Sequence, residues 1–342
     1  MFPFHAGAPR RANDDARLIA ANDLVRRTLS QHGLMPGGDA ASPMANWTMP
    51  QMPSFGTAPG ATAPGMTQFT CDAGSRDYLL HVPESAKDGV TGLVVVLHGC
   101  TQNAADFAAG TGMNAHADRD GFIVLYPQQS RGDNAQSCWN WFSRGDQLRG
   151  RGEPAIIAAM TQKIAADYGI TADRTFVAGL SAGAAMAVIL GQTYGDVFAA
   201  VGAHSGLPYS AARDVPTAFA AMNGQAAEPA APGPMPPTIV FHGGSDSTVA
   251  PINGTRIAAH AINHAAQTIE ADTNGTTNGR DWTLRTSRGN DGRALLEHWE
   301  IAGLGHAWSG GQPGGSYTDA KGPDASAEMV RFFFDLAGEA PK

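Results

Sequence analysis

The chain has 342 residues, of which 43% are hydrophobic and 16% are charged, and this composition excludes a wholly disordered protein. Acidic residues outnumber basic residues by 31 to 23, which gives a formal net charge of −8. Nucleic acids and anionic membrane surfaces need a basic face on their partner, so neither is expected to bind here. The three cysteines are too few for a disulfide scaffold.

The first 65 residues differ in composition from the rest of the chain. Apolar residues recur on one face of residues 14–32 and predict an amphipathic helix within an N-terminal unit, residues 1–34. Residues 35–65 are rich in proline, glycine and methionine, which predicts a linker or an arm that lies on the surface. We expect residues 66–342 to form the main domain.

The sequence also gives an expectation for location. The N-terminal residues lack the uninterrupted apolar stretch of ~7–15 residues that a secretory signal contains. No segment approaches the ~20 apolar residues of a membrane span. The sequence therefore predicts a cytoplasmic protein without a membrane span, or a secreted one if the N-terminus has been trimmed. It does not indicate an oligomeric state.

Beyond residue 66, short apolar runs alternate with stretches of helical periodicity. Strands are predicted at 76–85, 93–99, 122–127, 174–181, 199–206, 237–244 and 295–303. Helices are predicted at 104–120, 154–168, 182–194, 251–268 and 324–337, and surface loops at 223–237 and 271–293. This alternation predicts an α/β fold with a doubly wound, mostly parallel sheet and helices on both faces.

The strongest chemical signal is the segment Gly-Leu-Ser-Ala-Gly at residues 179–183. It lies directly between a predicted strand and a predicted helix, which is the context of a nucleophile elbow. In such a turn the serine hydroxyl projects above the sheet, so Ser181 is the predicted nucleophile. The alternative is a serine that caps a helix in a glycine-rich turn, which explains Ser181 but not the residues that follow.

A nucleophilic serine needs a base and a carboxylate that orients the base. In this fold the chain order is serine, then aspartate or glutamate, then histidine. Asp246 follows the predicted strand at 237–244, although an Asx turn would also explain an aspartate there. Of the four later histidines, only His306 lies in a glycine-flanked loop beyond the last strand. We therefore predict a triad of Ser181, Asp246 and His306.

An acyl-transfer site also needs two backbone N–H groups that face the oxyanion. Ala182 follows the nucleophile and is predicted to supply one of them. The other is predicted from Cys100, in the His-Gly-Cys turn after the strand at 93–99. Cys100 is expected to act through its amide, and a cysteine nucleophile is the less favoured alternative. His98 and His242 precede glycine at strand ends and are interpreted as structural.

Three tryptophans are candidates for a substrate-binding cleft. Trp139 and Trp141 belong to the segment Cys-Trp-Asn-Trp-Phe, and Trp308 closely follows His306. Aromatic walls suit an apolar acyl or aryl chain, while ordinary core packing is the alternative, above all for Trp141. Motifs for metals, dinucleotides and phosphates are missing from the sequence, so we predict neither a cofactor nor a metal.

The joint order of these motifs resembles the polyhydroxybutyrate (PHB) depolymerase-like esterases of the α/β-hydrolase superfamily. The resemblance is carried by LVVVLHGCTQ (93–102), CWNWF (138–142), GLSAGAAM (179–186), FHGGSDSTV (241–249) and GLGHAW (303–308). It implies that residues 66–342 are an α/β-hydrolase catalytic domain with the triad and oxyanion residues named above. It also implies a disulfide between Cys100 and Cys138.

The resemblance implies a serine carboxylester hydrolase that acts on short-chain hydroxyalkanoate polyesters or oligomers and on small esters. A feruloyl or aryl esterase is one alternative. A peptidase or an acyltransferase could use the same triad. A binding module without activity is least favoured, because such a protein would be expected to have lost the serine or the histidine.

Overall fold

A computed structural model describes residues 65–226 and 233–338 of the chain. The helix predicted within residues 14–32 lies outside the described residues, as does the linker predicted at 35–65 except for its last residue. Within the described part, no helix is long and apolar enough to cross a membrane.

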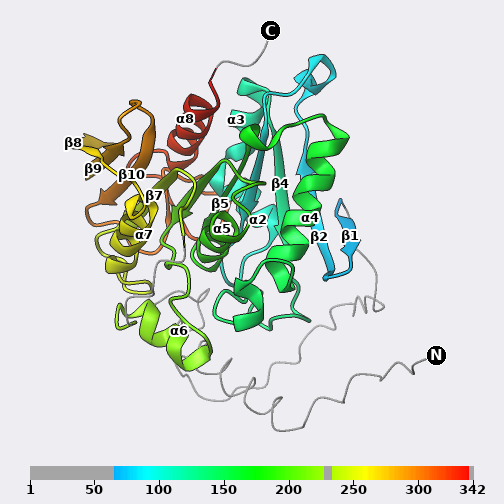
Figure 1. Ribbon diagram of the computed structural model, residues 1–342, viewed down its shortest axis with the longest axis horizontal. Helices are drawn as coiled ribbons and strands as arrows, with labels where there is room; N and C mark the ends of the chain where they lie inside the picture. The colour runs from blue at the N-terminus through cyan, green and yellow to red at the C-terminus, as the bar shows by residue number, and fades with distance from the viewer. Residues whose placement is uncertain (1–64, 227–232, 339–342) are drawn as a thin grey trace, which may run out of the picture. The chain divides into compact units, whose positions relative to one another are not determined.

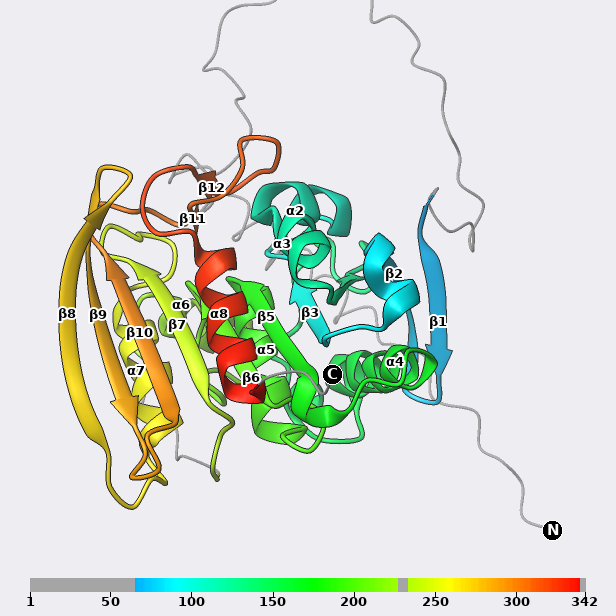
Figure 2. The same ribbon diagram turned by 90° about the horizontal axis from the view of Figure 1, so that it is seen from above.

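Ten strands form one sheet in the order β1-β2-β4-β3-β5-β6-β7-β10-β9-β8 (Figure 1). The six central strands, from β4 to β10, run parallel, whereas β1, β2, β9 and β8 pair antiparallel with their neighbours at the two ends (Figure 2). The bounds are β1 Thr67–Cys71, β2 Gly74–His81, β3 Leu93–Leu97, β4 Ile123–Gln128, β5 Thr175–Leu180, β6 Ala200–His204, β7 Thr238–Gly243, β8 Ile269–Thr277, β9 Arg280–Arg288 and β10 Ala294–Ile301.

Helices cover both faces of this sheet and enclose a separate apolar core on each (Figure 2). One face packs against α4 (Gly152–Asp167), α5 (Ala182–Thr193), α6 (Val215–Met222) and α7 (Ile252–Ile262). The other packs against α2 (Ala104–Thr111), α3 (Met113–Asp120) and α8 (Ala325–Ala337). The prediction of an α/β fold with a mostly parallel sheet and two helical layers is thus confirmed.

The central strands are apolar on both sides because helices cover both sides. All five residues of β3 and all six of β5 are buried. Short connections complete the main domain: the 3-10 helices η1 (Glu84–Asp88), η2 (Arg144–Gln147) and η3 (Ala172–Arg174), and a small parallel pair, β11 (Trp308–Ser309) with β12 (Thr318–Asp319).

The prediction of a surface loop at 271–293 is wrong, because most of this segment forms the hairpin β8–β9. Its side chains are polar because the hairpin is largely exposed, and its backbone extends the sheet by pairing with β10. The turn is Asn278-Gly279, with φ of +45° and +76°. An Asn-Gly pair is favoured where both central residues of a hairpin turn have positive φ.

Other boundaries differ from the prediction for local reasons. The helix predicted at 104–120 is divided at Gly112, which has a φ of +63°, and the helix predicted at 251–268 ends at Ile262. Strand β1 and helix α6 were not predicted. Each is short, and neither has a long apolar period.

Candidate active site

Ser181 lies in the turn that joins the end of β5 to the start of α5. Its φ of 57° and ψ of −118° place a non-glycine residue in a sparsely populated region. Two backbone hydrogen bonds secure this turn: the Ser181 N–H donates to the His204 carbonyl at 2.9 Å, and the Ser181 carbonyl accepts from the Ala185 N–H at 2.9 Å. A strained serine held between a strand and a helix is the geometry expected of a nucleophile elbow.

The two glycines of the motif are required by close backbone contacts. A Cβ atom on Gly179 would lie 2.4 Å from the carbonyl carbon of Gly183. A Cβ atom on Gly183 would lie 2.1 Å from the carbonyl oxygen of Leu97. Both distances are far inside van der Waals contact with backbone atoms, so any side chain at either position would displace the elbow.

Asp246 and His306, which the chain order predicts as partners, are hydrogen-bonded. The His306 Nδ1 atom lies 2.7 Å from Asp246 Oδ2. Asp246 follows β7 and His306 follows β10, and these two strands are neighbours in the sheet. The carboxylate also accepts hydrogen bonds from the N–H groups of Thr248 and Val249, each at 2.9 Å.

The Asp246 carboxylate is buried, at 5% exposure, yet it is held in its charged form. Burial acts to raise the pKa of Asp246, but the neighbouring His306 and His242 outweigh this and hold the pKa well below its usual range. His242 Nε2 lies 3.5 Å from Asp246 Oδ2 and 2.9 Å from the Val249 carbonyl. An ionised Asp246 can therefore orient the His306 ring and stabilise it when it takes up a proton.

Ser181 and His306 belong to different loops, and the described residues contain no hydrogen bond between their side chains. His204 links Ser181 to Ser309, three residues after His306: its carbonyl accepts from the Ser181 N–H, and its Nε2 accepts from the Ser309 N–H at 3.0 Å. Catalytic hydrogen bonds often tighten only when a substrate is bound. All three predicted triad residues thus follow the carboxyl ends of central parallel strands, Ser181 after β5, Asp246 after β7 and His306 after β10, with β6 between β5 and β7.

The turn that follows β3 lies against the elbow. A Cβ atom on Gly99 would lie 3.6 Å from the Cβ atom of Ser181, so this backbone passes beside the serine. The neighbouring amides of the turn are occupied. The Gly99 N–H donates to Gln102 Oε1 at 2.9 Å, and the Thr101 N–H donates to the Gln136 carbonyl at 2.7 Å.

The amides of the two predicted oxyanion residues are free of such partners. In residues 65–226 and 233–338, the Cys100 N–H has no hydrogen-bond acceptor. Ala182 is the first residue of α5, where helical geometry leaves the N–H without an intrahelical acceptor. The Cys100 amide directly follows Gly99, whose backbone passes beside Ser181, and the Ala182 amide directly follows Ser181, so both remain candidates for binding an oxyanion.

Cys100 and Cys138 form a disulfide, so the turn at residues 98–102 is covalently joined to the segment that follows β4. We call this turn the oxyanion turn, after its predicted role. Cys71 is the free cysteine of the described residues. Since the thiol of Cys100 is used in the disulfide, any role of this residue in binding an oxyanion must fall to its amide.

The predicted role of the tryptophans in substrate binding needs correction. Trp139 and Trp308 are completely buried and Trp141 is 5% exposed. The indole N–H of Trp139 donates to the His98 carbonyl at 3.1 Å, and that of Trp308 donates to Ser326 Oγ at 3.1 Å. All three rings are buried, and the indole N–H groups of Trp139 and Trp308 have partners there, so the rings leave almost no surface for a substrate.

Several side chains near the site were not singled out from the sequence. The Gln102 Nε2 group donates to the Ser316 carbonyl at 2.9 Å, and the Thr101 hydroxyl lies 3.0 Å from that of Tyr317. These contacts join the oxyanion turn to the loop that follows His306. The two residues of each contact are more than 200 residues apart in the chain, so no local pattern could have revealed these contacts.

Buried histidines make the stability of this site sensitive to acid. Burial lowers the pKa of His98 and His298 to about 4 and that of His204 to about 3, from 6.5. Below pH 6.5 these histidines bind a proton in the unfolded chain but stay neutral in the folded protein. The free energy of unfolding therefore falls as the pH drops toward 4. Each histidine contributes ~1.4 kcal/mol per pH unit within this window. Burial raises the pKa of Glu153 to about 7. Protonation of this one group acts in the opposite direction, because it increases the free energy of unfolding as the pH drops below 7.

Urea unfolding at pH 7, 6, 5 and 4 measures this loss directly. The His298→Gln variant is the matched comparison, because it removes one of the three groups and should flatten the dependence by about one proton. Stability that stays constant from pH 6.5 to 4 would contradict the prediction.

The described residues contain no cluster of three or more histidine, cysteine or acidic side chains that could hold a metal ion. The groups gathered at the carboxyl ends of β3, β5, β7 and β10 are instead a serine, a histidine, an ionised carboxylate and backbone amides. This set can perform acyl transfer through a serine nucleophile.

Comparison with known proteins agrees with this chemistry. Residues 76–279 match the family described as "Esterase PHB depolymerase". Poly(3-hydroxyalkanoate) depolymerase C from Paucimonas lemoignei is 35% identical over 280 residues, which cover 78% of this chain and 63% of that protein. The chain thus spans less than two thirds of the length of this relative. Feruloyl esterase B from Neurospora crassa is 34% identical over 119 residues, covering 34% of this chain and 40% of its own length.

The solved structures that resemble the chain include an acetyl xylan esterase from Aspergillus awamori. The two align with a TM-score of 0.60 at 20% identity, covering 78% of this chain and 98% of the other. This similarity concerns the fold, which is that of the α/β hydrolases. Because the family match extends over more than half of the 342 residues, the chain belongs to the Esterase PHB depolymerase family.

Proposed function

We propose that this protein is a serine carboxylester hydrolase. Ser181 attacks the ester carbonyl, and His306 takes the proton from its hydroxyl and returns it to the leaving alcohol. Asp246 holds the His306 ring in the orientation that leaves Nε2 facing the reaction. Water, activated by the same histidine, then releases the acid from the acyl enzyme.

The oxyanion of each tetrahedral intermediate is stabilised by the amides of Cys100 and Ala182. Both are backbone donors next to Ser181, and neither needs to reorient as negative charge develops. The observation that carries the proposal is the conformation of Ser181. Its strained φ of 57° lies between two glycines that contact neighbouring backbone, which is the arrangement that presents a serine hydroxyl in a nucleophile elbow.

Short-chain hydroxyalkanoate polyesters or their oligomers are the substrates we favour. The support is the family match together with the similarity to a poly(3-hydroxyalkanoate) depolymerase. Feruloyl or other aryl esters are the second candidate, supported by the similarity to a feruloyl esterase. The buried tryptophans do not favour either class, because their rings are not accessible.

The disulfide between Cys100 and Cys138 supports a location outside a reducing compartment. Disulfides persist in oxidising environments and are rare where glutathione keeps thiols reduced. The cytoplasmic location expected from the sequence stays a prediction, and of the two expectations we favour secretion on this ground.

A panel of 4-nitrophenyl esters of increasing acyl length tests the proposed function, with 3-hydroxybutyrate oligomers and methyl ferulate measured beside it. We expect kcat/KM to be largest for short acyl chains and oligomers to be cleaved faster than methyl ferulate. EDTA should leave the rates unchanged, since the proposed chemistry uses no metal. Hydrolysis of methyl ferulate alone would favour the second candidate, and failure to cleave any ester would overturn the proposal.

A further inference from the structure

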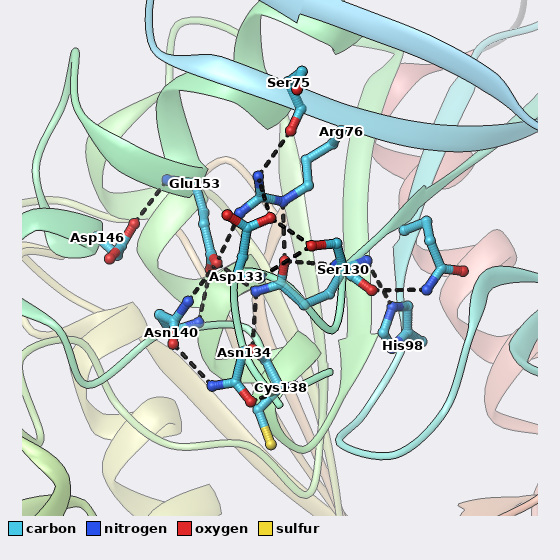
Figure 3. A network of polar contacts seen from close by, with 12 residues as sticks. Ser75, Arg76, His98, Ser130, Asp133, Asn134, Cys138, Asn140, Asp146 and Glu153 are labelled. Atoms are coloured by element: carbon cyan, nitrogen blue, oxygen red, sulfur yellow. Dashed lines mark hydrogen bonds and ion pairs between the residues drawn. The ribbon is translucent and has the colours of Figure 1, made fainter. Parts of the chain in front are cut away.

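A buried carboxylate with no role in the proposed mechanism lies behind the oxyanion turn. Glu153 is in the first turn of α4 and is 2% exposed. Its Oε1 atom accepts hydrogen bonds from Arg76 Nη2 at 3.2 Å, Asn140 Nδ2 at 2.7 Å and Gln129 Nε2. Its Oε2 atom accepts from the backbone N–H of Asn140 at 2.7 Å. Figure 3 shows these contacts converging on Glu153.

The partners of Glu153 hold both ends of the segment 129–140. At its start, the Gln129 side chain also donates to the Cys138 carbonyl at 2.9 Å, and its Oε1 accepts from Arg76 Nε at 2.9 Å. At its end, Asn140 Oδ1 accepts from Asn134 Nδ2 at 2.9 Å. One carboxylate therefore organises a segment that has no helix or strand beyond residue 129.

The side-chain amide of Asn134 continues this order within the segment. Its Oδ1 atom accepts from the N–H groups of Gln136 at 3.0 Å and Cys138 at 3.3 Å. These are the residues through which the segment reaches the oxyanion turn. The carbonyl of Gln136 receives the Thr101 N–H at 2.7 Å, and Cys138 is bonded to Cys100.

His98 provides two more links to the same turn. The Gln129 N–H donates to His98 Nε2 at 3.1 Å, and the other ring nitrogen, Nδ1, donates to the Gly99 carbonyl at 2.8 Å. The His98 carbonyl accepts from the Trp139 indole at 3.1 Å. The turn that holds the Cys100 amide is thus attached to segment 129–140 on both sides.

The electrostatic surroundings of Glu153 disfavour its ionised form. Burial and the nearby Asp146 raise the pKa of Glu153 to about 7, and Arg76 acts against them. Arg76 itself also lies 3.1 Å from Asp133, and the Glu153 N–H donates to Asp146 at 2.8 Å. A buried ion pair is often less stabilising than well-packed apolar residues of the same volume, so stability alone does not explain a carboxylate here.

We propose that Glu153 is a positioning residue that sets the Cys100 amide in place for the oxyanion. The inference rests on the proposed function, since it assigns a role within that mechanism. In its ionised form Glu153 accepts from all four donors and donates to none, which is the form that these contacts require. A glutamine would turn an NH₂ group toward donors that already point inward, so segment 129–140 would shift and carry the oxyanion turn with it.

The Glu153→Gln variant tests this role. We expect kcat for a short 4-nitrophenyl ester to fall ~10- to 100-fold with little change in KM, because a displacement of ~1 Å at a reacting centre can cost ~100-fold. The affinity of phenylboronic acid, whose tetrahedral serine adduct needs the oxyanion donors, should fall in parallel. The final extent of Ser181 labelling by a fluorophosphonate, measured on the same samples, shows that the nucleophile is still present.

Glu297→Gln is the matched control. Glu297 is a buried carboxylate, 3% exposed, that pairs with Arg331 of α8 on the other face of the sheet. The Glu297→Gln variant should lower the Tm as Glu153→Gln does, but it should leave kcat and boronate affinity unchanged. If Glu153→Gln behaved in the same way, the positioning role would be refuted.

A second variant keeps the inference testable if Glu153→Gln does not fold. Asn134→Ala removes the amide that orders Gln136 and Cys138 but leaves no buried charge unpaired, and it should lower kcat and boronate affinity in the same proportion. Unchanged values in this folded variant would also overturn the inference. Failure of the proposed function would look different, because an active Ser181→Ala variant, or a wild-type protein without esterase activity, would contradict the mechanism itself.

Discussion

Replacing Ser181 by alanine is expected to reduce ester hydrolysis by ~10⁶-fold, because residual catalysis would come only from binding and the oxyanion donors. The fold should survive, since alanine is smaller than serine and Ser181 takes part in the elbow through its backbone N–H and carbonyl. The measurement is kcat on a short 4-nitrophenyl ester, with circular dichroism and Tm recorded on the same preparation.

Ser287→Ala is the matched control for this variant. Ser287 is a fully buried serine of β9, and its hydroxyl has no partner within the described ranges 65–226 and 233–338. Its loss should leave kcat unchanged. Substantial activity in Ser181→Ala would exclude this residue as the nucleophile, whatever the control does.

His306→Ala should be almost as damaging as Ser181→Ala, because the residues of a triad act as a unit. Without the imidazole, no group is placed to accept the serine proton, and the Asp246 carboxylate loses its 2.7 Å partner. The activity that remains should change little between pH 5 and 9, since the proposed general base is gone. Rates measured from pH 5 to 9 on both proteins check this.

His298→Ala separates a catalytic histidine from a structural one. His298 is 2% exposed in β10, and burial lowers its pKa to about 4. Its loss should lower the Tm while the shape of the pH profile is kept. If His298→Ala were inactive and His306→Ala active, the base would have been assigned to the wrong loop.

The parts of the fold that the sequence predicts well are those whose physics is local. A strand such as β3 must be apolar at every position because helices cover both of its faces, so Leu93–Leu97 is recognisable alone. The elbow is recognisable for a similar reason, since Gly179 and Gly183 are required by contacts within one turn and its nearest strand.

The features that escaped prediction depend on partners far away in the chain. Glu153 resembles an ordinary helix-start acid until Arg76, 77 residues earlier, is placed beside it. A tryptophan next to a motif gives no indication of which way its ring points, and Trp308 turns inward because Ser326 accepts its N–H. The hairpin β8–β9 was missed for another reason, because an exposed hairpin has no apolar face to signal it. Its Asn278-Gly279 turn was the available clue.

The same hairpin affects how copies of the molecule meet. β8 is the last strand of the ten-stranded sheet, so among the described residues its outer backbone groups have no neighbouring strand. Such an edge is a template for pairing with another chain, and long flat apolar edges aggregate. Glu270 places a charge on this edge, and Asp272 forms an ion pair with Arg285 of β9 at 3.1 Å, so the edge is polar rather than apolar. The polarity that concealed the hairpin in the sequence is thus also a feature by which exposed sheet edges are made poor templates for pairing.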